Sequence, residues 1–212
     1  MKNVLVVKAN NRPDGISTKM YDTFMETVKD NKNMNINVYD IFEEDMPYIG
    51  HELFSALGKI QNEEALDADE QRLMDAKQKA MDAFEAADVI VFAFPLWNLA
   101  IPARLQTFID YVYSAGFTFK YNADGSMAQL MTDKKIILLN ARGGMYSAPE
   151  MQGMDMSHNY MKNVIGGVFG MEIIDEVIIE GHNAMPQEAA RIIEEGLESV
   201  RECARELNVQ FA

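Results

Sequence analysis

Short polar side chains follow the first apolar run of the sequence, residues 2–8. Asn10, Ser17 and Thr18 offer hydrogen-bond donors, and Lys19 adds a positive charge. If a helix begins at Ser17, these side chains and the free N–H groups of its first turn form an anion site. The alternative is a solvated turn in which Ser17 only caps the helix. Because the segment lacks Gly-x-x-x-x-Gly-Lys and Gly-x-Gly-x-x-Gly spacings, it favours neither a P-loop nor a tightly held adenine dinucleotide.

An apolar loop follows a second strongly apolar run at residues 89–94, where a solvent-exposed loop would favour polar residues. Two prolines, Pro95 and Pro102, keep its backbone rigid, and it holds the only tryptophan of the chain. A flat ligand explains this composition, with backbone amides at its edge and an aromatic wall beside it. The alternative is a tryptophan that covers the core or contacts a second subunit. The residues expected to line such a ligand are Pro95, Leu96, Trp97, Asn98 and Leu99.

A glycine-rich loop follows a third apolar run at residues 134–140 and begins with Ala141 and Arg142. Gly143 and Gly144 allow the backbone to approach a ligand closely. Arg142 can donate to a carbonyl or stabilise negative charge. The alternative is an ordinary glycine-rich turn with a solvated arginine. The argument for a site therefore depends on all three loops meeting at one place.

Strand and helix patterns alternate along the chain and must position these loops. The predicted strands cover residues 2–8, 35–40, 89–94, 134–140 and 172–180. The predicted helices cover residues 17–30, 68–86, 102–115, 155–168 and 187–207. Residues 41–66 are expected to be irregular because Pro47 and Gly50 interrupt them, and residues 117–130 are expected to form a hairpin with Asp124-Gly125 at its tip.

This alternation predicts an α/β fold in which one five-stranded parallel sheet lies between two layers of helices. Right-handed crossovers and five strands favour the flavodoxin-like strand order 2-1-3-4-5, with the hairpin as an excursion after the third crossover helix. No linker or repeat interrupts residues 1–212, so a single domain is expected. Ligands of such sheets bind beyond the carboxyl ends of the strands, between strands 1 and 3. The three loops are expected to meet there.

Composition restricts the partners and the location. The 212 residues carry a net charge of −14, which argues against nucleic acid and anionic membrane surfaces as partners. No apolar stretch is long enough to span a membrane, and the single cysteine favours a reducing cytoplasm. The three histidines are scattered without ligand spacing, so no metal is expected. A small-molecule ligand fits these restrictions.

The same loops closely resemble the FMN-dependent NADH azoreductase and NAD(P)H quinone oxidoreductase family, and the likeness spans nearly the whole chain. The matching segments are Val4–Lys8, Pro95–Leu99, Asp110, Gly116–Tyr121, Ala141–Ser147, Phe169-Gly170 and Glu180–Asn183. The resemblance implies a flavodoxin-like homodimer that holds FMN non-covalently. NADH or NADPH would serve as the transient electron donor, and a quinone or azo compound as the acceptor. Hydride transfer through the flavin would make the kinetics ping-pong.

The resemblance also implies a role for each loop. The phosphate would be held by Asn10, Ser17, Thr18 and Lys19. The flavin ring would be lined by residues 95–99. Its polar edge would meet Ala141, Arg142, Gly143 and Gly144. Tyr121 and Trp97 would face the substrate pocket, with Tyr121 reaching that of the partner subunit.

Two other functions are compatible with the predicted fold. A flavodoxin-type carrier would pass single electrons to protein partners, but the apolar loop and the extra hairpin favour an enzyme with an enclosed pocket. A response-regulator-like domain without a cofactor would need carboxylates at its strand ends. The first and third strands end instead at Lys8-Ala9 and Phe94-Pro95.

Overall fold

The computed structural model describes residues 1–211, and its centre is a five-stranded sheet. Its strands are β1 (Lys2–Lys8), β2 (Met34–Asp40), β3 (Val89–Pro95), β6 (Lys135–Arg142) and β7 (Glu172–Glu180). All four strand pairings are parallel, and the order is β2-β1-β3-β6-β7. The predicted order 2-1-3-4-5 is therefore confirmed.

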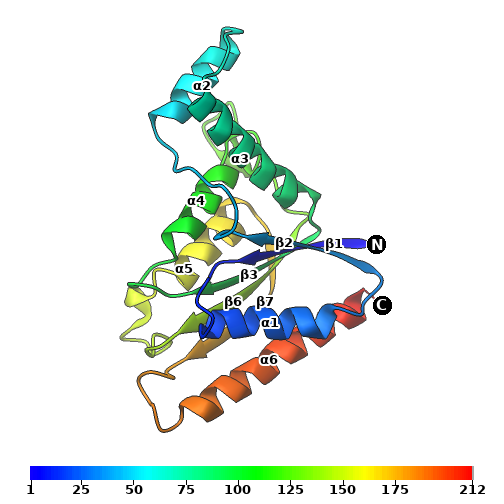
Figure 1. The fold of residues 1–212 in the computed structure, drawn as a ribbon, viewed down its shortest axis with the longest axis vertical. Coiled ribbons are helices and arrows are strands. Elements are labelled where there is room, and N and C mark those ends of the chain that lie inside the picture. Colours follow the sequence, from blue (N-terminus) through cyan, green and yellow to red (C-terminus); the bar gives the residue numbers. More distant parts are fainter. Residues whose placement is uncertain (212) are drawn as a thin grey trace.

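Helices cover both faces of the sheet, as Figure 1 shows. On one face lie α1 (Ile16–Val28) and α6 (Ala189–Gln210). The other face carries α3 (Ala68–Ala86), α4 (Ala103–Val112), α5 (His158–Met161) and the π-helical turn Lys162–Val168. The three-layer sandwich is confirmed.

The central strand β3 explains why both faces need cover. Every residue from Val89 to Pro95 is buried. Side chains alternate across the sheet, so Ile90 and Phe92 enter the core beneath α3 and α4, whereas Val91 enters the core beneath α1 and α6. A continuous apolar run is the pattern that such a doubly covered strand requires.

The prediction that residues 41–66 are irregular is wrong in part, because α2 (His51–Gln61) lies within them. Pro47 and Gly50 precede this helix and do not interrupt it. Only Leu53 and Ala56 are buried, so its apolar pattern is too short to stand out in the sequence. Figure 1 shows α2 beside the amino-terminal part of α3, beyond the end of the sheet.

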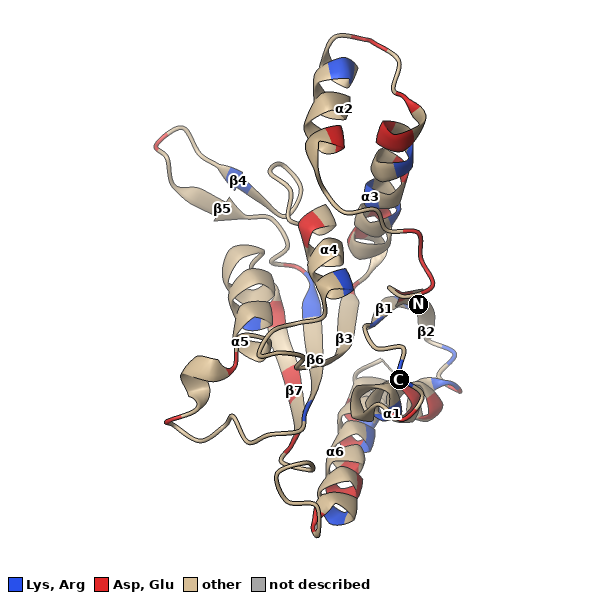
Figure 2. Ribbon diagram, turned by 60° about the vertical axis from the view of Figure 1, so that its left-hand side comes forward, with Lys and Arg blue, Asp and Glu red and all other residues tan. Residues whose placement is uncertain are grey.

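Two other predicted segments differ in detail. The helix expected at 155–168 begins only at His158, as α5 followed by the π-helical turn, and a separate 3₁₀ turn, Gln152–Met154, precedes it. The hairpin at 117–130 is confirmed as β4 (Phe119–Tyr121) and β5 (Met127–Gln129), an antiparallel pair. Gly125 at its tip has φ of +83°, a conformation that glycine adopts without strain. Figure 2 shows this hairpin projecting from the body of the molecule.

Candidate functional site

A cleft of about 120 Å³ lies at the carboxyl edge of the sheet. Loops that follow β1, β3, β6 and β7 all contribute to it. Its lining includes seven of the predicted site residues: Asn10, Ser17, Pro95, Leu96, Trp97, Ala141 and Gly143. The structure therefore brings residues of the three predicted loops together, because parallel strands end at a common edge.

The wall after β1 is built around the amino terminus of α1. No side chain caps this helix, and its first turn has no acidic residue, so its free N–H groups are available to an anion. The Asn10 amide donates instead to the Ser17 hydroxyl over 2.9 Å, and both side chains are buried. Ser17 is thus not the helix cap. Gly15 leaves room for the Asn10 amide, since a Cβ there would lie 2.4 Å from Asn10 Nδ2 and displace it.

Thr18, Arg12 and Lys19 stand in different positions relative to this wall. The Thr18 hydroxyl donates to the Arg12 carbonyl over 2.9 Å, which closes the loop onto the helix. Arg12 belongs to the cleft lining, and its guanidinium pairs with Asp14 at 2.9 Å, which lowers the pKa of that carboxyl. Lys19 is exposed and lies outside the cleft lining.

The wall after β3 is a tight two-residue turn. Trp97 and Ala100 exchange both backbone hydrogen bonds, at 2.9 and 3.0 Å. The intervening residues have positive φ, +52° for Asn98 and +68° for Leu99. Such a turn normally takes Asn-Gly, and a leucine in the left-handed region costs about 1 kcal/mol or more. The turn is therefore a strained feature beside the cleft.

Trp97 is shared between two clefts. The second cleft, of about 550 Å³, lies beside α4 and includes Phe42, Asn98, Ile101 and Arg104 in its lining. Phe42 meets Trp97 edge-on, with ring centres 6.3 Å apart. Leu99 lines neither cleft, although it belongs to the same turn.

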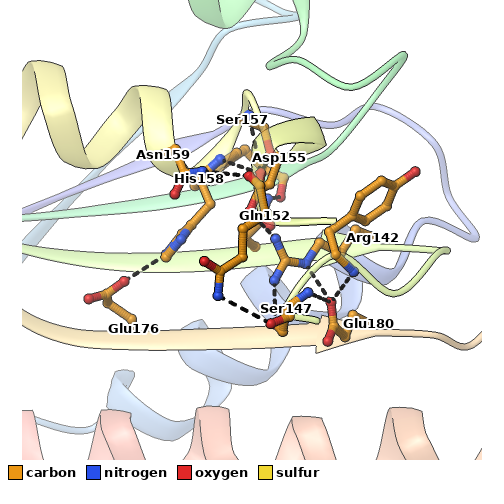
Figure 3. Close-up of polar contacts among 12 residues, drawn as sticks. Arg142, Ser147, Gln152, Asp155, Ser157, His158, Asn159, Glu176 and Glu180 are labelled. Carbon is orange, nitrogen blue, oxygen red and sulfur yellow. Dashed lines mark hydrogen bonds and ion pairs between the residues drawn. The ribbon is translucent and has the colours of Figure 1, made fainter. Parts of the chain in front are cut away.

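The side chain of Arg142 enters a buried cluster of charges (Figure 3). Its guanidinium is 2% exposed, pairs with Asp155, and lies 3.0 Å from Glu180. It also donates to the Ser147 hydroxyl over 2.8 Å. Glu180 accepts the N–H groups of Tyr146 and Ser147, at 2.9 and 3.2 Å. These contacts thus connect the loop after β6 to the end of β7.

This pairing changes what Arg142 can contribute. Its charge is already opposed by two carboxylates, and its side chain is absent from the cleft lining, where Ala141 and Gly143 appear. Gly144 also lies outside that lining, and its carbonyl accepts the N–H of Gly181 at 3.1 Å.

Tyr121 lies on the projecting hairpin, is 69% exposed, and is not part of the cleft of its own chain.

The loop after β7 contributes two cleft residues that the site prediction omitted, His182 and Asn183. His182 Nδ1 is buried without a hydrogen-bond partner, and burial lowers the pKa of the imidazole. Asn183 packs so tightly that a Cβ on Gly143 would lie 2.3 Å from its amide nitrogen. The available signal was positional, because the fifth predicted strand ends at the same edge as the others.

Within residues 1–211, no cluster of three or more His, Cys, Asp or Glu side chains is arranged to hold a metal ion. No helix in that described part is both long and apolar enough to cross a membrane.

Comparisons with known proteins agree with this geometry. A family model described as a flavodoxin-like fold matches residues 2–203. An FMN-dependent NADH:quinone oxidoreductase 1 of Bacillus licheniformis is 44% identical over 207 residues, which cover 96% of this chain and 99% of that protein. The protein of the same name from Listeria monocytogenes serovar 1/2a is 45% identical, with 97% and 99% covered. An azoreductase structure from Bacillus anthracis strain Sterne matches with a TM-score of 0.88 and 40% identity, covering 97% and 100%.

Proposed function

The chain belongs to the flavodoxin-like family of FMN-dependent NADH:quinone oxidoreductases and azoreductases, and from this premise we propose that it reduces quinones and azo compounds with electrons from NADH. The observation that carries the proposal is the cleft at the carboxyl edge, where residues from the loops after β1, β3, β6 and β7 meet around an uncapped helix terminus. The names of the relatives, FMN-dependent NADH:quinone oxidoreductases, favour an NADH-dependent enzyme over a single-electron carrier.

The residues of the cleft fit FMN. The uncapped terminus of α1 and the paired Asn10 and Ser17 side chains offer N–H and O–H groups to a phosphate. His182 lines the cleft, and we propose that its imidazole makes one further polar contact with the bound molecule. At neutral pH the lowered pKa keeps this imidazole uncharged, so it acts as a hydrogen-bonding group.

The charges around the cleft favour an anion locally in an acidic protein. Arg12 lines the cleft, and its partner Asp14 is exposed, so a bound phosphate can share or replace this exposed pairing. We propose that Thr18 supports the loop through the Arg12 carbonyl, whereas Lys19 acts on the phosphate at longer range.

We assign the apolar part of the cleft to the flavin ring of FMN. Pro95, Leu96 and Trp97 present rigid backbone and one aromatic wall, and Trp97 continues into the wider apolar cleft. When bound, FMN supplies the hydride chemistry, accepting two electrons from the nicotinamide and delivering them to the acceptor. The chain binds and orients these molecules and excludes water from the reacting ring. We assign the polar edge of the ring to Ala141 and Gly143, the two residues of the loop after β6 that line the cleft.

We propose further that the enzyme is a cytoplasmic homodimer with no nucleic-acid or membrane partner. Tyr121 is exposed on a projecting hairpin, where it is available to the pocket of a second copy. Sedimentation velocity tests this proposal, since the chain mass is 23.9 kDa and a dimer would have twice that mass.

An anaerobic flavin titration tests the proposed reaction. Protein loaded with FMN should lose flavin absorbance on mixing with NADH, regain it on adding a quinone, and show parallel double-reciprocal plots in steady state. NADPH is compared in the same way. A stable semiquinone during photoreduction, without bleaching by NADH or NADPH, would contradict the enzyme and support the electron carrier.

Matched variants test the position of the cofactor. Asn10→Ala should weaken FMN binding, because it removes a buried donor at the phosphate end. Asn122→Ala, in the exposed hairpin turn, is the control for loss of an amide and should bind FMN like the wild type. Unchanged FMN affinity in Asn10→Ala would exclude the phosphate from this end of the cleft.

A further inference from the structure

Arg142 and Asp155 form the most buried ion pair of the described chain, with 2% and 5% of their side chains exposed. A buried pair of this kind is costly to form, so it is weak evidence for stability by itself. Its position is more informative, because it joins the end of β6 to the segment just before α5. Figure 3 shows the pair and its surrounding contacts.

The second carboxylate oxygen of Asp155 organises its own segment. It accepts the backbone N–H of Ser157 at 3.2 Å, the Ser157 hydroxyl at 3.1 Å, and the N–H of His158 at 3.0 Å. The bond to the residue two positions ahead is an Asx turn, which fixes the backbone on either side of Met156. The N–H of Met156 then donates to the carbonyl of Leu99 over 3.0 Å.

Leu99 is at the tip of the strained turn beside the cleft. Among the backbone hydrogen bonds of residues 1–211, the bond from Met156 is the one that joins this tip to another segment of the chain. The positive φ of Leu99 is unfavourable for a leucine, whereas Asn98 suits its position, so the surrounding structure must hold Leu99. A continuous path of contacts therefore leads from Arg142 through Asp155 and Met156 to the turn.

We propose that Arg142 and Asp155 are positioning residues that hold the Trp97–Ala100 turn in its strained shape. They do this through the Met156–Leu99 hydrogen bond and without touching the bound molecule. The further step, that a fixed turn strengthens the binding of flavin, rests on the proposed function. On this view the positive charge of Arg142 stabilises the loops around the ring and makes no contact with the ring itself.

The single tryptophan makes the turn directly observable without cofactor. In FMN-free protein, Asp155→Asn should increase quenching of Trp97 fluorescence by acrylamide, because the turn loses its anchor. In FMN-binding titrations the same variant should bind roughly tenfold more weakly, as is usual when an outer partner that orients a binding group is lost. Wild-type quenching in Asp155→Asn would overturn the inference, whatever the FMN result.

Glu70→Gln is the matched control, since Glu70 is also a buried carboxylate and accepts from Lys59, Ser55 and the Asp67 backbone. It lies at the α2–α3 contact, so its loss should leave Trp97 quenching and FMN affinity at wild-type values. An equal change in both variants would show general loosening and would overturn the inference.

A rescue experiment separates positioning from loss of folding. Adding Leu99→Gly to Asp155→Asn creates the Asn-Gly pair that this turn type prefers, so Trp97 shielding should return without the anchor. Hydrogen exchange of the wild-type protein needs no variant, and the Met156 amide should be protected like the sheet. Rapid exchange at Met156 would exclude the anchor.

If wild-type protein failed to bind FMN, the proposed function would be wrong, and the Trp97 and exchange measurements would still decide whether the turn is held in this way.

Discussion

At the scale of single residues, the site depends on side chains that are paired with one another more than on free reactive groups. Asn10 pairs with Ser17, and Arg142 pairs with Asp155. His182 Nδ1 is the exception, a buried polar atom of the cleft without a partner. We infer that the chain contributes shape and fixed dipoles to the reaction, which agrees with a cofactor that carries the chemistry.

Gly15→Ala should lower FMN affinity with little loss of fold stability. The backbone of Gly15 has φ of −65° and ψ of 134°, which alanine adopts freely, but the new Cβ would displace the Asn10 amide. Fluorescence titration of FMN and thermal unfolding of the FMN-free protein measure the two effects.

Gly58→Ala is the control for this substitution. Gly58 lies in α2 with open space around its Cβ position, so alanine should stabilise the protein by about 0.5–1 kcal/mol and leave FMN binding alone. Unchanged FMN affinity in Gly15→Ala would contradict the role given to the Asn10 amide.

At the scale of elements, the contact between α2 and α3 depends on one carboxylate. Asp67 caps α3, and Glu70 completes a capping box while it also binds Lys59 and Ser55 of α2. These hydrogen bonds lower the pKa of Glu70 to about 2 from its ordinary value of 4.5, with Lys59 as the largest cause. Glu70 is therefore expected to stabilise the α2–α3 contact most while it is ionised.

The stability difference between wild type and Glu70→Gln should depend on pH. A lowered folded-state pKa means that the ionised group stabilises the fold above pH 4.5, and that this contribution is lost as the pH falls toward 2. Urea unfolding at pH 7 and pH 3 measures the difference, which should be smaller at pH 3. An equal difference at both pH values would show that the Glu70 charge is not stabilising.

At the scale of the whole molecule, two apolar cores share one sheet. Phe108 lies in the core beneath α3 and α4, and Phe24 lies in the core beneath α1. Both rings are fully buried. Because each strand of the centre contributes side chains to both cores, we expect residues 1–212 to unfold as one cooperative domain.

Phe24→Ala and Phe108→Ala should each destabilise the protein by about 3–5 kcal/mol and lower the same single thermal transition. Differential scanning calorimetry with and without FMN measures it, and the bound cofactor should raise the Tm of that transition. Two transitions, each moved by only one of the variants, would contradict the single-domain prediction.

Much of the fold was open to prediction because apolar periodicity is a local property. The apolar runs at residues 2–8 and 89–94 are typical of strands covered on both faces, and the alternation of strand and helix patterns restricts the strand order. That order in turn gathers the loops after β1, β3 and β6, since parallel strands end at one edge. The location of the cleft was thus determined by the sequence.

The direction of individual side chains was decided by the tertiary structure. Arg142 and Asp155 lie thirteen positions apart in a loop without periodicity, so nothing local pairs them, and only packing turns the guanidinium toward Asp155 and Glu180. The same holds for the Met156–Leu99 bond, which joins segments distant in the chain, and for the position of His182 in the cleft lining. The sequence determined where the loops meet, because strand direction follows from local pattern. Only the folded chain decided what each side chain contacts, because such contacts depend on positions that no local pattern relates.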